Sequence, residues 1–237
     1  MEKQMMIYER AVPVSKERHR GLSVRTGHDY GFASDLSAVP LLTTEFENAS
    51  REFPIIFSAT NGGCTPAALV GLRDAENLFL TADHGWDAKY IPAFIRRYPF
   101  VFSQTPDGDK FTLCIDEGFS GCNQDGEGDA LFDEAGETSD YLRRILGFTK
   151  TYQREFQITR AFCDMLSALD ILTPGEVKFP LEDEKKGVTR GLLTVDRELL
   201  KGLPATKLSG LAKSGDLEKI YTHLLSLGNV DAVGSRL

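Results

Sequence analysis

The sequence predicts an α+β protein in which a mostly antiparallel sheet packs against one long helix, with a smaller helical part at the C-terminal end. Up to residue 137, short β-branched and aromatic runs alternate with turn residues, a pattern typical of antiparallel strands. Residues 139–170 carry apolar side chains at helical spacing. Beyond residue 195, short amphipathic segments separated by Gly and Pro predict short helices.

The first half is predicted to form a β-meander, with its turns at Gly, Asn, Asp and Pro clusters such as residues 61–63 and 106–109. Pro92 and Pro99 bracket a predicted short helix, since proline suits a first helical turn and biases the preceding residue out of the helix. Residues 15–27 are polar and basic, and they are interpreted as an exposed connection. The predicted strands are residues 4–9, 12–14, 53–57, 67–72, 78–80, 100–103, 111–116 and 131–133.

The most strongly predicted element is the helix across residues 139–170. Thr138 or Ser139 suits its N-cap, and one apolar face then continues to Leu169. Pro174 and Gly175 are predicted to stop the helix. A hairpin over 177–181 and 192–195 and short helices at 198–203 and 207–213 follow. The last helix, 216–227, is predicted to turn Leu217, Ile220, Tyr221, Leu224 and Leu225 inward.

Length and composition indicate a single domain over residues 1–237. A division into a β-rich part (1–137) and a helical part with a hairpin (138–237) is the alternative. The net charge of −8 disfavours nucleic-acid binding, because an acidic chain repels phosphate at long range. The sequence shows no secretory signal and no apolar run long enough to span a bilayer. It therefore predicts a cytoplasmic protein without an integral membrane segment, with export by a route that needs no N-terminal signal as the alternative.

Known catalytic and cofactor motifs do not appear in the sequence. GxSxG, SxxK, GxGxxG and GxxxxGK[ST] are absent, and the four cysteines have no zinc-ligand spacing. Free buried thiols are predicted, with a Cys114–Cys122 disulfide as the alternative. Residues 123–134 resemble a calcium loop, but Asn123 stands at its first position and no helix precedes it. An exposed acidic loop is favoured, cation binding is left open, and no cofactor is predicted.

Two groups of residues are candidates for function. His84 could form an acid/base or metal site if the fold brings Asp116 or Glu117 to it, whereas His223 is predicted to be a packed or capping residue. Arg96 and Arg97 lie among aromatic residues, a combination that suits anion or peptide binding. Aromatic rings turned inward and arginines in water or paired with acids are the alternative. The candidate ligand-binding residues are Arg96, Arg97, Tyr90, Tyr98, His84, Asp116 and Arg160.

Nine segments, in this order, resemble the SapC family, which is named for a gene linked to surface-layer protein export. They are residues 7–15, 71–74, 76–79, 90–100, 113–116, 131–133, 159–163, 195–196 and 220–227. The resemblance covers nearly the whole chain and implies a bacterial protein linked to envelope or export systems. It assigns no catalytic residue.

The function expected from this resemblance is that of a non-catalytic accessory or binding protein. It would serve the bacterial envelope, S-layer export or a neighbouring modification system. Its expected partners are proteins of such a system, and a homo-oligomer is compatible with the sequence. The alternative is an enzyme with a carboxylate/His site assembled by the fold, with or without a metal.

Overall fold

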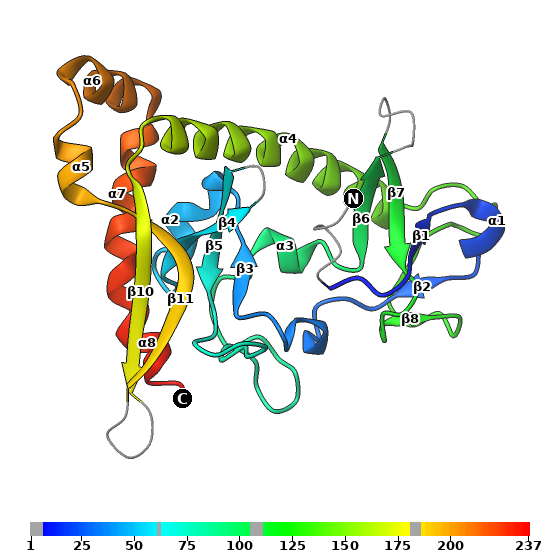
Figure 1. The fold of residues 1–237 in the computed structure, drawn as a ribbon. Coiled ribbons are helices and arrows are strands. Elements are labelled where there is room, and N and C mark those ends of the chain that lie inside the picture. Colours follow the sequence, from blue (N-terminus) through cyan, green and yellow to red (C-terminus); the bar gives the residue numbers. More distant parts are fainter. Residues whose placement is uncertain (1–6, 61–62, 105–110, 181–185) are drawn as a thin grey trace. The chain divides into compact units, whose positions relative to one another are not determined.

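A computed structural model describes residues 7–60, 63–104, 111–180 and 186–237 (Figure 1). Antiparallel sheets and the long helix α4 (Asp140–Ala168) confirm the predicted α+β class. The chain divides into two compact units. The first contains residues 1–33, 80–86 and 94–154, and the second contains residues 34–79, 87–93 and 155–237. Each unit therefore draws on both sides of residue 137, and α4 contributes to both.

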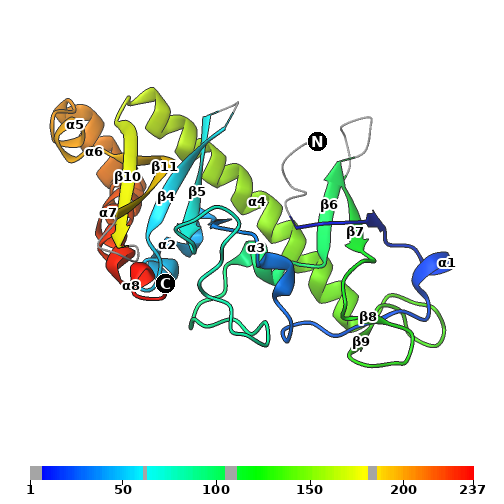
Figure 2. The same ribbon diagram turned by 60° about the horizontal axis from the view of Figure 1, so that its bottom comes forward.

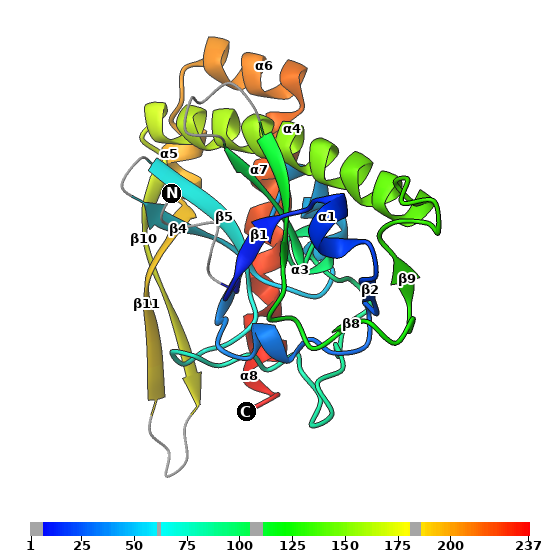
Figure 3. The same cartoon turned by 90° about the vertical axis from the view of Figure 1, so that its right-hand side faces the viewer.

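The first unit contains two small antiparallel sheets, ordered β1-β7-β6 and β8-β2-β9. Pro13 is the last residue of the edge strand β1. Proline has no N–H to donate, and at this position no hydrogen bond between strands is lost. Figure 3 shows α1 between β1 and β2 along the chain. The elements are β1 (Ala11–Pro13), α1 (Lys16–His19), β2 (Ser23–Val24), α3 (Ala93–Arg96, shared with the second unit), β6 (Phe100–Gln104), β7 (Phe111–Asp116), β8 (Cys122–Asn123) and β9 (Asp129–Ala130).

The second unit is built on one five-stranded antiparallel sheet, ordered β10-β11-β4-β5-β3. Its strands are β3 (Ala38–Pro40), β4 (Ile55–Thr60), β5 (Gly63–Leu69), β10 (Leu172–Pro180) and β11 (Lys186–Val195). Its helices, besides part of α4, are α2 (Phe46–Ala49), α5 (Arg197–Lys201), α6 (Ala205–Ser214), α7 (Asp216–Ser226) and α8 (Val230–Gly234). Figure 2 shows α5, α6 and α7 gathered near the β10–β11 hairpin. The helix α7 packs on β4 and β11.

The part of α4 in the second unit is fixed by both apolar and polar contacts. Phe162 meets Phe46 edge to face, with ring centroids 6.1 Å apart. The Thr159 hydroxyl accepts a hydrogen bond from the Thr43 N–H at 2.9 Å. Both threonines are buried, so water does not reach these polar groups. The bond gives each of them a hydrogen-bond partner within the protein. In the described part of the chain, no helix has the length and apolar character needed to cross a bilayer.

The predicted strands at 12–14, 100–103 and 111–116 and the helices α3, α4, α5, α6 and α7 are confirmed within a few residues. Several local predictions were wrong. Residues 15–27 are not an exposed connection, because they form α1 and β2 and bury His19. Pro174 and Gly175 lie inside β10, which carries a bulge there, and the chain turns out of α4 at Asp170 with φ 53°. The predicted strands at 78–80 and 131–133 are only isolated bridges, of Leu80 with Trp86 and of Phe132 with Thr138.

Some predicted features fall wholly or partly outside the described residues. They are the strand at 4–9 and the turns at 61–63 and 106–109.

Candidate functional site

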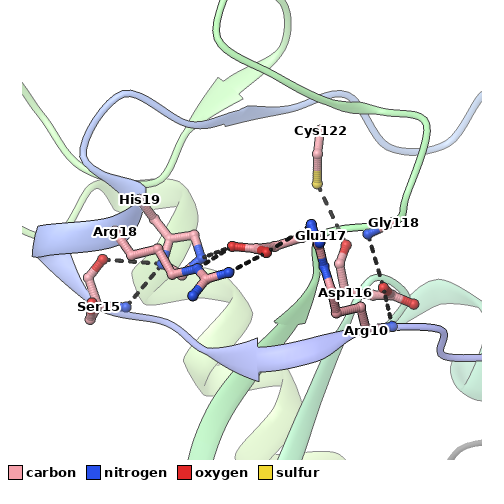
Figure 4. Close-up of polar contacts among 8 residues, drawn as sticks. All are labelled: Arg10, Ser15, Arg18, His19, Asp116, Glu117, Gly118 and Cys122. Atoms are coloured by element: carbon pink, nitrogen blue, oxygen red, sulfur yellow. Dashed lines mark hydrogen bonds and ion pairs between the residues drawn. The ribbon is translucent and has the colours of Figure 1, made fainter.

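Asp116, the last residue of β7, is fully buried in the first unit. Its carboxylate accepts hydrogen bonds from the N–H groups of Arg10 at 2.9 Å and Gly118 at 3.0 Å (Figure 4). It also accepts one from the Glu9 N–H at 2.7 Å. The Tyr98 hydroxyl donates a fourth, at 3.3 Å. These four donors replace the water that a buried carboxylate loses. Asp116 therefore holds the segment before β1 against the end of β7.

The next residue, Glu117, gathers three basic side chains around one carboxylate. Its oxygens lie 2.7 Å from Arg18 Nη2, 3.0 Å from Arg10 Nη2 and 3.3 Å from His19 Nε2 (Figure 4). The hydrogen bonds from Arg18, with the charges of Arg18, Arg10 and His19, lower the pKa of Glu117 to about 2. Such a carboxylate stays ionised near neutral pH, so it is poorly suited to exchange protons there.

Glu117→Gln is expected to remove a stabilisation that exists only while the carboxylate is ionised. Its pKa is about 2 in the folded chain, whereas an ordinary glutamate has a pKa of about 4.3. Because the folded value is the lower one, the contribution is fully present above about pH 4.3 and is lost as the pH falls toward 2. Urea unfolding of both proteins from pH 7 down should show a difference that shrinks across this window. A difference independent of pH would contradict this assignment.

His19 is buried with both ring nitrogens facing internal groups. Its Nδ1 lies 3.1 Å from the Ser15 N–H, and its Nε2 lies 3.3 Å from Glu117. The Ser15 carbonyl oxygen also lies 3.1 Å from Nδ1, so this nitrogen finds a partner in Ser15 whether it donates or accepts. His19 is thus enclosed between α1 and the end of β7. The polar composition of residues 15–27 gave no signal for this burial.

The nearby thiol of Cys122 is not set up as a nucleophile. Its Sγ lies 3.7 Å from the Asp116 carbonyl oxygen, to which it donates (Figure 4). Burial, with the charges of Asp116 and Glu117, raises its pKa to about 11. The thiolate, which is the reactive form of cysteine, is therefore rare near neutrality.

Arg97 lies in the interior of the first unit, enclosed by aromatic rings. Its guanidinium carbon is 4.5 Å from the Phe94 ring centroid, 4.6 Å from that of Tyr152 and 5.8 Å from that of Tyr8. Within the described residues, no carboxylate pairs with it, and its Nε has no hydrogen-bond partner. Cation–π attraction to these rings offsets part of the cost of removing the guanidinium from water. The exposed neighbour, Arg96, lies 5.5 Å from the Phe148 ring centroid.

The structure brings only some of the sequence-predicted site residues together. Tyr98 contacts Asp116, and both lie in the first unit with Arg97. Tyr90 and Arg160 belong to the second unit. There, the Tyr90 hydroxyl donates to Glu45 at 2.7 Å, and Arg160 is exposed on α4. Whether any of these residues binds a ligand stays a prediction.

His84 pairs with Asp29, in place of the Asp116 or Glu117 that the sequence suggested. Its Nδ1 lies 3.3 Å from Asp29 Oδ1, and both side chains are about half exposed. The Asp29 carboxylate accepts hydrogen bonds from the Gly31 N–H at 2.8 Å and from the Ser120 hydroxyl at 2.9 Å. These bonds and His84 keep the pKa of Asp29 low, with the Gly31 N–H as the largest cause. The Tyr30 N–H donates a hydrogen bond to the His84 carbonyl oxygen at 2.9 Å.

The backbone around His84 is specialised for this pairing. His84 has φ 62°, in the left-handed region that few non-glycine residues adopt. A β-carbon on Gly31 would lie 2.7 Å from His84 Nδ1, so a larger residue there would push the ring out of its present position. Asp29 is far from His84 in the sequence, and no local pattern could have indicated the pair.

The loop that resembled a calcium site uses its oxygens internally. The Asn123 side chain accepts from the Glu127 N–H at 3.0 Å and donates to the Glu127 carbonyl at 2.8 Å. The Glu127 carboxylate lies 3.3 Å from Arg25. Among the residues that the structure describes, no group of three or more His, Cys, Asp and Glu side chains could hold a metal ion.

The fold and these contacts define an α+β protein whose buried charges hold the first unit together. A family model described as SapC matches residues 14–233, nearly the whole chain. The chain therefore belongs to the SapC family, as its sequence segments predicted. Neither a curated protein nor a solved structure matches it.

Proposed function

We propose that this chain is a non-catalytic accessory protein that acts by binding a protein partner. The partner would belong to a bacterial envelope, S-layer export or neighbouring modification system. Family membership supports the link to such systems. The first unit supports the non-catalytic role, because Asp116, Glu117 and His19 are engaged in contacts within the chain.

The outer face of α7 is the observation that carries this proposal. Leu225 is 74% exposed and Tyr221 is 41% exposed, one helical turn apart. The sequence pattern placed both on the inner side, and this prediction was wrong. Large apolar side chains that lie side by side in water are unfavourable while no partner covers them. Such groups are typical of surfaces that bind another protein. We assign the outer face of α7, defined by Tyr221 and Leu225, as the partner-binding surface.

Polar anchors on the inner side explain why α7 turns these residues outward. The His223 Nδ1–H donates to the Ile55 carbonyl at 2.7 Å, and its Nε2 accepts from the Val195 N–H at 3.1 Å. The Ser226 hydroxyl accepts from the Ile55 N–H at 2.9 Å. Burial lowers the pKa of His223 to about 4, so the ring stays neutral and can keep both bonds near pH 7. This confirms that His223 is a packed residue.

Site-specific crosslinking tests the assigned surface. A photo-crosslinking residue in place of Leu225, in the full chain within native cells, should give a defined protein adduct. The matched control replaces Ile158, which is 49% exposed on α4 of the same unit. An adduct at 225 that is absent at 158 is expected. Equal adducts at both positions, or none at 225, would rule out the outer face of α7 as the binding surface.

An enzyme is the second candidate, favoured by the Asp29–His84 pair. A carboxylate that orients Nδ1 leaves Nε2 to accept a proton from a substrate. Within the described residues no hydrogen bond occupies that nitrogen. This alternative predicts a small-molecule turnover that His84→Gln abolishes and that His28→Gln, at an exposed neighbouring position, retains. Turnover that survives His84→Gln unchanged would exclude the pair as its base.

A further inference from the structure

The imidazole ring of His223 bridges two strands in the sheet of the second unit. In the described part of the chain, β4 and β11 pair directly at residues 57–58 and 192–193. Extending this antiparallel register by two residues places Val195 opposite Ile55. The ring lies between them, because its Nε2 accepts from the Val195 N–H at 3.1 Å and its Nδ1–H donates to the Ile55 carbonyl at 2.7 Å. The side chain thus takes the place of a backbone hydrogen bond between the strands.

The same ring fastens α7 to the sheet. Ser226, three residues after His223, accepts from the Ile55 N–H at 2.9 Å and donates to the His223 carbonyl at 2.6 Å. The ring is fully buried, and its centroid lies 4.9 Å from that of Phe57. Three elements, β4, β11 and α7, therefore meet at one titratable side chain.

Both hydrogen bonds of the ring require its neutral form. A carbonyl oxygen can only accept, so Nδ1 carries the proton, and Nε2 is unprotonated because it faces an N–H donor. A second proton on Nε2 would place this group and the Val195 N–H against each other as two donors. Val195 is buried, so its N–H would lose its acceptor where water does not reach it.

The nearby charges on α5 do not favour a protonated ring. Arg197 is the charged group that acts on His223, and it carries the same sign as an imidazolium. The Asp196 carboxylate caps α5, because it accepts from the N–H groups of Glu198 and Leu199 at 2.8 and 2.9 Å. The Glu198 side chain pairs with Lys201 at 2.8 Å. Burial, with the charge of Arg197, lowers the pKa of His223 to about 4, although the bond to the Ile55 carbonyl opposes this.

The other titratable side chains described on α7 and on the elements packed against it face water or each other. Asp216 pairs with Lys219 at 2.8 Å. The exposed ones are Glu218 and Tyr221 on α7, Glu47 on α2, Arg190 on β11, and Lys207 and Lys213 on α6. Within the described residues, no carboxylate pairs with the His223 ring.

We propose that His223 is an acid-sensitive switch, in which a proton on Nε2 opens the junction of β4, β11 and α7. The ring takes the proton from water and becomes an imidazolium, and the Val195 N–H loses its acceptor. The open state lets water hydrate the charge that the closed junction excludes. The opening does not depend on a partner. Because α7 also carries Tyr221 and Leu225, acid would loosen that face too, a consequence that rests on the proposed function.

The opening is expected to increase as the pH falls from about 6.5 toward 4. An ordinary histidine has a pKa of about 6.5, and the value of about 4 in the folded chain is the lower one. The closed state therefore binds fewer protons, so its advantage is complete above about pH 6.5 and is lost progressively below it. Between pH 7.5 and 5, the equilibrium constant for opening should rise about 30-fold.

Native-state hydrogen exchange of the full chain tests the switch. The protection of the Val195 amide is measured from pH 7.5 to 5 and corrected for the intrinsic exchange rate at each pH. We expect this protection to fall about 30-fold. The Ala67 amide, in the β4–β5 pair of the same sheet, should keep its protection. Equal falls at both amides, or a Val195 protection that does not change with pH, would overturn the proposal.

Two variants assign the effect to one ring. His223→Gln removes the titrating group, so its Val195 protection should not change over this pH range. His28→Gln, at an exposed position, is the matched control and should show the same fall as wild type. An equal fall in His223→Gln would assign the effect to another group. If His223→Gln does not fold, an NMR titration of the His223 ring in wild type decides. A midpoint near pH 4 supports the switch, and a midpoint near 6.5 contradicts it.

Discussion

Asp116→Ala is expected to lower the free energy of unfolding by about 3 kcal/mol. The N–H groups of Glu9, Arg10 and Gly118 and the Tyr98 hydroxyl would all lose their acceptor. An unsatisfied buried donor costs about 1–3 kcal/mol, and water can reach some of these groups once the side chain is removed. Urea denaturation of the full chain measures the change.

The matched control for Asp116 is Asp125→Ala, in the exposed loop of the same unit. Its effect should stay within about 0.5 kcal/mol, as for most surface substitutions. Asp116→Asn should fall between the two, because its amide keeps one oxygen acceptor but turns an NH₂ group toward N–H donors. If Asp116→Ala destabilised the chain no more than Asp125→Ala does, Asp116 could not be the anchor described above.

Arg97→Ala is expected to cost a similar amount, about 3 kcal/mol, because it empties the space between three aromatic rings. Arg97→Met should recover most of that loss. Methionine fills the same space, contacts rings favourably through its sulfur and buries no charge. Chemical denaturation of both variants measures the difference, with Arg160→Ala on the exposed face of α4 as the control.

The comparison of the Arg97 variants separates packing from charge. Equal, large losses in Arg97→Ala and Arg97→Met would mean that the charge itself is required. No loss in either variant would contradict the packing role. An anion that stabilises the wild type but not Arg97→Met would instead support the ligand-binding role predicted from the sequence.

The elements that the sequence predicted well are those that local pattern determines. The helix α4 follows from an apolar face that continues without interruption through 29 residues. The strand β7 matches its predicted bounds because apolar residues end at a turn-forming acidic pair. The family resemblance, which depends on short segments in order, was confirmed for the same reason.

The sites were harder to predict because long-range polar contacts determine them. His19 is buried in contact with Glu117, which lies far from it in the sequence, whereas the residues next to His19 in the sequence are polar. On α7, His223 and Ser226 take inner positions by bonding to strand backbone, so apolar periodicity misplaces Tyr221 and Leu225. The Asp29–His84 pair needs a positive φ and a facing glycine, which no hydrophobic pattern reports.

The most direct test of the proposed accessory role is affinity co-purification of the full chain from native cells. Wild type is compared with Leu225→Ser and with the matched surface variant Ile158→Ser. We predict a protein partner that wild type and Ile158→Ser retain and that Leu225→Ser loses while remaining folded. The same proteins retained by all three chains, or none retained by wild type, would contradict partner binding through α7.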